Sequence, residues 1–148
     1  MYDDILVPTD GSDTVGETLD HALPIAVANE ATIHALSVVD TRITAAADGD
    51  SREEVRRSLE AECEEAVATV ASRAADAGVE SVSEIRHATP WKGILQYADD
   101  ADVDLIAIGT HGKTPREKRT SMGSVSERVV DDAKIPVLVV RDAGGGEP

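Results

Sequence analysis

This chain of 148 residues has few aromatic residues, few lysines and a single cysteine. It has no phenylalanine, and apart from histidine its aromatic side chains are those of Tyr2, Trp91 and Tyr97. Alanine, valine, isoleucine and leucine must therefore fill the core, which suits helices packed closely on a sheet of branched side chains. The hydrophobic fraction of 41% is within the globular range. The length fits one domain, which we place at residues 1–142.

The scarcity of cysteine and of long apolar runs bears on where the protein works. Cys63 is the only cysteine, so an internal disulfide is excluded and we expect a reducing cytoplasm. No apolar run approaches the ~20 residues of a membrane-spanning helix. Residues 1–4 lack the basic residues that open a secretory signal peptide. We therefore expect a cytoplasmic protein that does not contact membranes.

Positive charge is also scarce. The chain has 14 basic and 29 acidic residues, which gives a net charge of −15. Such a charge repels nucleic acid at long range, so we expect no nucleic-acid partner. Acidity on this scale is typical of halophilic proteins, because high salt screens the self-repulsion. A disordered acidic chain is the alternative, but the regular apolar runs favour a folded protein.

Short apolar runs alternate with helical stretches along the chain. Runs at residues 5–7, 33–39, 105–108 and 135–140 predict strands that are buried on both faces, as in a parallel sheet. Residues 79–86 are a weaker candidate that suits an edge strand. Helices are expected at residues 12–29 (with a kink at Pro24), 51–77, 90–98 and 124–132. This order predicts an α/β domain with helices on both faces of a mainly parallel sheet.

The ends of these elements carry local signals. Ser51 and Thr89 are expected to cap the helices that follow them, with Pro90 in the first helical position. Gly78 is expected to end the longest helix, whose apolar stripe includes Cys63 as a small buried side chain. Residues 40–50 are predicted to form a polar mobile loop, and residues 143–148 a disordered tail.

A glycine-bounded loop follows the fourth apolar run. It reads Gly109-Thr110-His111-Gly112, then ten residues, then Gly123-Ser124 at the start of a helix. Glycines let backbone N–H groups approach an anion, and the helix start adds unpaired N–H groups. The hydroxyls of Ser124 and Ser126 could donate further hydrogen bonds. The combination predicts a phosphate-binding site.

Basic residues gather inside this loop. Four of the 14 basic residues fall within seven positions: Lys113, Arg116, Lys118 and Arg119. They could direct a local positive field at phosphates. Alternatively, they belong to a solvated loop that balances nearby acidic residues. The histidines, in contrast, are too scattered for a metal site.

The first apolar run ends in a second set of candidate binding residues, Pro8, Thr9 and Asp10. In open α/β sheets, ligands bind beyond the carboxyl ends of strands. Asp10 could accept hydrogen bonds from ribose hydroxyls or from an adenine amino group. Alternatively, Asp10 or Ser12 merely caps the next helix. Together with the glycine loop, this end favours a nucleotide site.

Three segments together resemble the universal stress protein family. They are Ile5-Leu6-Val7-Pro8-Thr9-Asp10-Gly11-Ser12, Ala35-Leu36-Ser37-Val38-Val39-Asp40, and Asp104-Leu105-Ile106-Ala107-Ile108-Gly109-Thr110-His111-Gly112 followed by Gly123-Ser124-Val125. The resemblance runs from Tyr2 to Arg141. It implies a Rossmann-like, five-stranded parallel sheet of order 3-2-1-4-5 and a homodimer.

The same resemblance, to the ATP-binding branch of the family, implies roles for the site residues. Asp10 would bind the ribose or adenine, and the backbone of Val38 would contact the adenine. ATP, or ADP or AMP, would be held at its phosphates by Gly109, Gly112, Gly123 and Ser124, beside Lys113 and Val125. Mg²⁺ or Mn²⁺ would bridge phosphate oxygens. The spacer of ten residues from Lys113 to Met122 departs from the nine of that branch, but one extra loop residue costs little closure entropy.

We therefore interpret the chain as a cytoplasmic, ATP-binding stress-response protein with a regulatory or protective role. One alternative is a slow ATPase or nucleotidyl-transfer enzyme, although no positioned base or Walker lysine-serine pair is evident. Another is a dimeric interaction module that binds no nucleotide, which the longer spacer would suit. The apolar last strand, residues 136–140, would leave a sheet edge open unless a second copy pairs with it.

Overall fold

The computed structural model describes residues 1–110 and 123–141. Its centre is a sheet of five parallel strands in the order β3-β2-β1-β4-β5, which confirms the predicted order. The strands are β1 (Asp4–Pro8), β2 (Thr32–Asp40), β3 (Ser81–Ala88), β4 (Leu105–Gly109) and β5 (Val137–Val140). The predictions for Gly112, for Lys113 and the other basic residues of the loop, and for the tail lie outside the described residues.

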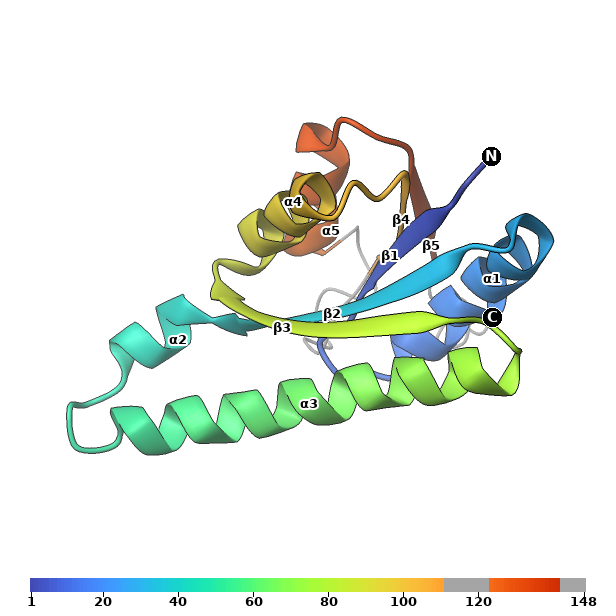
Figure 1. Ribbon diagram of the computed structural model, residues 1–148. Helices are drawn as coiled ribbons and strands as arrows, with labels where there is room; N and C mark the ends of the chain where they lie inside the picture. The colour runs from blue at the N-terminus through green and yellow to red at the C-terminus, as the bar shows by residue number, and fades with distance from the viewer. Residues whose placement is uncertain (111–122, 142–148) are drawn as a thin grey trace, which may run out of the picture.

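Helices cover both faces of the sheet (Figure 1). One face packs against α1 (Thr14–Asn29) and α3 (Arg52–Asp76), and the other against α4 (Pro90–Asp100) and α5 (Ser124–Asp132). In β1 the side chains alternate between two cores, since Val7 packs with Leu19 and Val70, whereas Leu6 packs with Ile94 and Val129. Burial on both faces explains why the strands are continuous apolar runs. No described helix has the length and apolar character needed to cross a membrane.

A short helix, α2 (Thr41–Ala46), occupies much of the segment that the sequence predicts to be a polar loop. That prediction was wrong because Asp40 caps the helix, its carboxylate accepting a hydrogen bond from the Arg42 N–H at 3.0 Å. A helix of six residues with no buried residue has no apolar periodicity to reveal it.

The helix-end predictions have mixed outcomes. Gly78 follows α3 with φ of 74°, which confirms it as the helix-ending glycine, and Pro90 opens α4. Ser51 and Thr89 are the N-cap residues of their helices, as predicted, but neither side chain makes a cap hydrogen bond. The hydroxyl of Ser51 instead lies 3.3 Å from the Asp48 carbonyl oxygen. The prediction of an edge strand is confirmed by β3.

Candidate functional site

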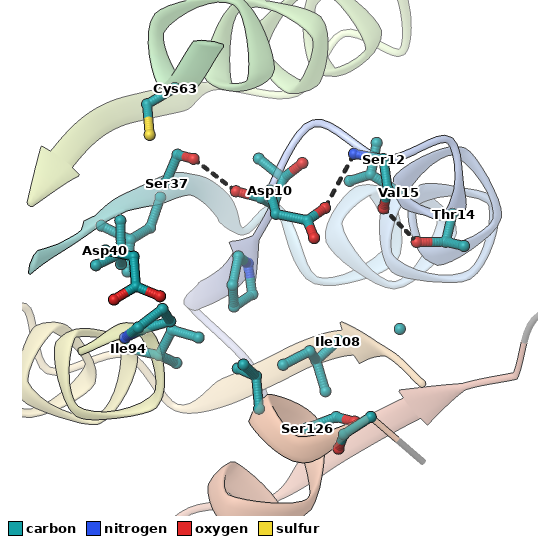
Figure 2. Close-up of a pocket in the computed structure, with 18 of the residues that line it drawn as sticks. Asp10, Ser12, Thr14, Val15, Ser37, Asp40, Cys63, Ile94, Ile108 and Ser126 are labelled. Carbon is teal, nitrogen blue, oxygen red and sulfur yellow. Dashed lines mark hydrogen bonds between the residues drawn. The ribbon is translucent and has the colours of Figure 1, made fainter. Parts of the chain in front are cut away.

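A cavity of about 400 Å³ lies at the carboxyl ends of β1, β2 and β4 (Figure 2). From β1 the chain continues to β2, which lies toward one edge of the sheet, whereas from β4 it continues to β5 at the opposite edge. This divergence is the topological position at which open α/β sheets bind ligands. The described residues predicted to bind nucleotide all line this cavity: Pro8, Thr9, Asp10, Val38, Gly109, Gly123, Ser124 and Val125.

The amino-terminal end of α5 forms one end of this cavity. Gly123 is the N-cap residue, with φ of −66° and ψ of 159°, and no side chain in the described part of the chain caps it. The first helical hydrogen bond runs from the Glu127 N–H to the Gly123 carbonyl at 3.0 Å. The amides of Ser124 and Val125 precede that bond, so helix geometry leaves them for a ligand.

Ser126 lines the cavity, and its side chain also makes hydrogen bonds within the chain. Its hydroxyl is buried and lies 3.1 Å from each of the carbonyl oxygens of Thr110 and Gly123. Gly123 also donates its N–H to the Thr110 carbonyl. The hydroxyl thus joins the end of β4 to the start of α5, and its donation to a phosphate stays a prediction.

The segment after β1 is fixed to β2 by hydrogen bonds. Thr9 donates its N–H to the Leu36 carbonyl at 2.9 Å, and its own carbonyl accepts from the Ser37 hydroxyl at 2.7 Å. The Asp10 carboxylate accepts from the Ser12 N–H at 2.9 Å within a local turn. The N-cap of α1 is Asp13. The alternative that Asp10 or Ser12 caps this helix was therefore wrong.

Gly109 is a glycine for a reason that the sequence alone does not reveal. A Cβ atom there would lie 3.2 Å from Thr18 Oγ1 and 3.6 Å from Thr14 Oγ1, both on α1. The missing side chain thus lets α1 pass close to the end of β4.

Val38 lies where β2 runs past the end of β1. The last residue of β1, Pro8, pairs with Leu36, so from Val38 onward β2 has a strand partner only in β3. In a strand, the N–H and C=O groups of alternate residues point to the same side. The Leu36 carbonyl accepts a hydrogen bond from Thr9, so the N–H and C=O groups of Val38 point to that same side of β2. At Val38 this side faces the cavity.

Several lining residues were not predicted from the sequence. They come from α2, α3 and α4 and the end of β2, and include Asp40, Arg42, Ile43, Leu59, Glu62, Cys63, Pro90 and Ile94. Cys63 is buried, as its place in the apolar stripe predicts, yet its thiol is also part of the cavity wall (Figure 2). Helical periodicity reports only which face is covered, so it could not separate core from cavity.

An ion pair shapes the α2 side of the cavity. The Arg42 guanidinium donates to both carboxylate oxygens of Asp40, from Nε at 2.9 Å and from Nη2 at 2.8 Å. These hydrogen bonds lower the pKa of Asp40 below its usual value, although partial burial opposes the shift. In the described residues, no group of three or more His, Cys, Asp or Glu side chains could hold a metal ion.

Comparison with known proteins agrees with this architecture. The model of the universal stress protein family matches residues 1–141. The chain belongs to this family. Universal stress protein MJ0531 of Methanocaldococcus jannaschii is 39% identical over 143 residues, which are 95% of this chain and 83% of that protein.

Solved structures of universal stress proteins share the fold. MJ0577 of M. jannaschii has a TM-score of 0.87 at 30% identity, covering 97% of this chain and 99% of that chain. A universal stress protein in complex with cAMP has a TM-score of 0.69 at 25% identity, covering 96% of this chain and 99% of that chain. The likeness to the universal stress proteins predicted from sequence is thus confirmed.

Proposed function

We propose that this universal stress protein binds an adenine nucleotide, ATP, and acts as a regulatory or protective stress-response protein. The observation that carries the proposal is that the start of α5 and the main chain of Val38 line one cavity of about 400 Å³. Phosphate-binding and base-binding groups are thereby available to one ligand. The related universal stress protein in complex with cAMP supports an adenine nucleotide as the class of ligand.

In this proposal the two ends of the cavity bind different parts of the nucleotide. The amides of Ser124 and Val125 hold the phosphates, with Gly109 and Gly123 at the same end. Asp10 binds the ribose, beside Pro8 and Thr9, and the main chain of Val38 binds the adenine. Gly112 and Lys113 would complete the phosphate end. Mg²⁺ or Mn²⁺ would be bound chiefly by the phosphate oxygens, because the described part of the chain has no metal-binding cluster.

The test is calorimetric titration with ATP, ADP and AMP in molar KCl. The wild type should bind ATP, and Gly123→Val should abolish binding because the side chain fills the space beside the α5 amides. Valine readily adopts the φ and ψ of Gly123, so the backbone is not strained. Gly49→Val is the matched control, since nothing lies within 4 Å of a Cβ atom at Gly49. No binding by the wild type would refute the proposal.

We further propose that the protein is a cytoplasmic homodimer adapted to high salt. Cys63, the single cysteine, is buried and forms no disulfide, which suits a reducing compartment. β5 is an edge strand whose residues Val137, Leu138 and Val139 are partly exposed, so pairing with a second copy would cover it. Light scattering in molar KCl should give the mass of a dimer, and a monomer mass would refute this assembly.

A further inference from the structure

Gly93 lies in the first turn of α4, where the helix packs against the end of β2. A Cβ atom at this position would lie 3.1 Å from Val38 Cγ2, 3.2 Å from Val38 Cγ1 and 3.4 Å from Ala88 Cβ. The first two distances are shorter than ordinary contacts between carbon atoms. Glycine is thus the residue that lets α4 reach this separation from β2.

The side chain of Val38 cannot relieve such a contact by rotation. Both of its methyl groups already lie near the position of the added atom. Three staggered positions surround the Cβ of valine and two are occupied by methyl groups, so each rotamer leaves a methyl group near Gly93. An alanine at position 93 would therefore have to move the backbone of β2 or the axis of α4.

At Val38 the backbone of β2 has a strand partner on one side only. On one side Val38 pairs with Arg86 of β3, and the Arg86 side chain bonds to Glu84 at 2.8 Å and to Asp100 at 2.9 Å. On the other side β1 has ended and the cavity begins. A displacement caused at position 93 would thus reach the main-chain groups that line the cavity at Val38. Pro90 and Ile94, on the same helix, line it too.

We propose that Gly93 is a positioning residue for the nucleobase end of the cavity. Its missing side chain sets the distance between α4 and Val38, and so fixes the main-chain groups that receive the base. This inference rests on the proposed binding of ATP. It assigns Gly93 no contact with the ligand, and it predicts a smaller effect at the phosphate end, because Gly93 faces Val38 and Ala88 rather than α5.

The test is a double-substitution cycle with two ligands, ATP and inorganic tripolyphosphate, the second titrated directly or by competition. Gly93→Ala should weaken ATP binding by about tenfold, which is about 1.4 kcal/mol. Binding of tripolyphosphate, which has no base, should stay within about twofold. Val38→Ala removes both clashing methyl groups, so adding Gly93→Ala to Val38→Ala should cost no further ATP affinity.

The matched control is Gly16→Ala, also a glycine-to-alanine change inside a helix. The nearest atom to a Cβ at Gly16 is the Arg73 Nη1 at 3.8 Å, an ordinary contact. It should bind both ligands like the wild type. Unchanged ATP binding by Gly93→Ala would overturn the inference, as would equal losses for both ligands or an undiminished cost in the Val38→Ala background.

These outcomes separate the two proposals. If the wild type binds ATP and Gly93→Ala binds it equally well, only the role of Gly93 is refuted. If the wild type binds no ATP at all, the proposed function is refuted and the role of Gly93 falls with it. Thermal unfolding of each variant checks that the protein titrated is folded.

Discussion

Asp40 and Arg42 illustrate how single residues give structure to a segment with almost no apolar character. Asp40 accepts from the Arg42 main chain and from its guanidinium, so one carboxylate both caps α2 and forms an ion pair. The Asp40 side chain is 16% exposed and that of Arg42 is 63% exposed. Such a pair orders a helix end but adds little stability, because solvent screens the guanidinium.

Removing this guanidinium should raise the pKa of Asp40 toward the usual carboxyl value. We expect Arg42→Ala to do so in a carbon-detected NMR titration, because the largest cause of the lowered pKa is the side-chain hydrogen bond. Since the folded pKa is depressed, the pair stabilises the protein above about pH 4 and the contribution is lost as the pH falls through the folded pKa. Arg57→Ala is the control, as Arg57 pairs with Glu53 on α3. An unchanged Asp40 pKa in Arg42→Ala would contradict this assignment.

Tyr97 contributes to a buried hydrogen-bonded group that joins three elements. His34 Nδ1 lies 2.7 Å from the Tyr97 hydroxyl, and His34 Nε2 lies 2.9 Å from Asp4 Oδ1. Tyr97→Phe leaves a buried ring nitrogen without its partner, which should cost about 1–3 kcal/mol of unfolding free energy. Urea denaturation measures this loss. A change smaller than the error of the extrapolation would show that the hydroxyl contributes nothing.

At the scale of elements, the strands were predictable and the connections were not. Ile5, Ile33 and Ile106 lie in runs whose continuity signals burial on both faces, and this signal depends on no other part of the chain. The strand order came from likeness to a family. The start of α2 is set by the Asp40 carboxylate, which accepts a hydrogen bond from the Arg42 N–H and which no apolar pattern records.

The candidate site shows the same division. The ends of β1 and β4 carry recognisable glycine and aspartate signals, and their lining of the cavity is as expected. The wall formed by Ile43, Leu59 and Ile94 was missed, since apolar residues on helices look alike whether they face a core or a cavity. The hydrogen bond of Ser126 to the end of β4 was not predicted, because a serine in the first turn of a helix can face a ligand or a neighbouring strand end.

The hydrogen bonds that connect the end of β4 to the start of α5 give a prediction at the scale of elements. Ser126→Ala removes the hydroxyl that lies between the carbonyls of Thr110 and Gly123 and should lower the unfolding free energy by about 1 kcal/mol. It should also weaken ATP binding, because the start of α5 is held less firmly. Ser124→Ala is the control for stability, since Ser124 is exposed. Equal unfolding free energies for the two variants would refute the role of Ser126.

At the scale of the whole molecule, salt acts both on the attraction within ion pairs and on the repulsion among the excess negative charges. Surface pairs such as Arg73–Asp20, at 2.9 Å, are weakened by salt. The net charge of −15 is repulsive in the folded state, and salt screens that repulsion as well. The two effects have opposite signs, and because 29 acidic residues face only 14 basic ones we expect the loss of repulsion to be the larger.

We therefore expect the melting temperature to rise as KCl is increased from about 0.1 M to above 1 M, with most of the rise at the low end, where the screening length changes most. Differential scanning calorimetry measures this directly. Potassium glutamate and KCl should be compared, because screening depends on ionic strength rather than on the anion. A melting temperature that falls with salt would mean that the attractive pairs dominate.

The most direct test of the nucleotide proposal is a titration of the ¹⁵N-labelled protein with Mg-ATP in molar KCl, followed by amide NMR. Binding should shift the amide signals of Val38, Ser124 and Val125 most strongly, because they lie at the two ends of the cavity. The amide of Gly49, which does not line the cavity, should not move. Unmoved signals at Val38 and Ser124 in the presence of saturating ATP would contradict the proposed site.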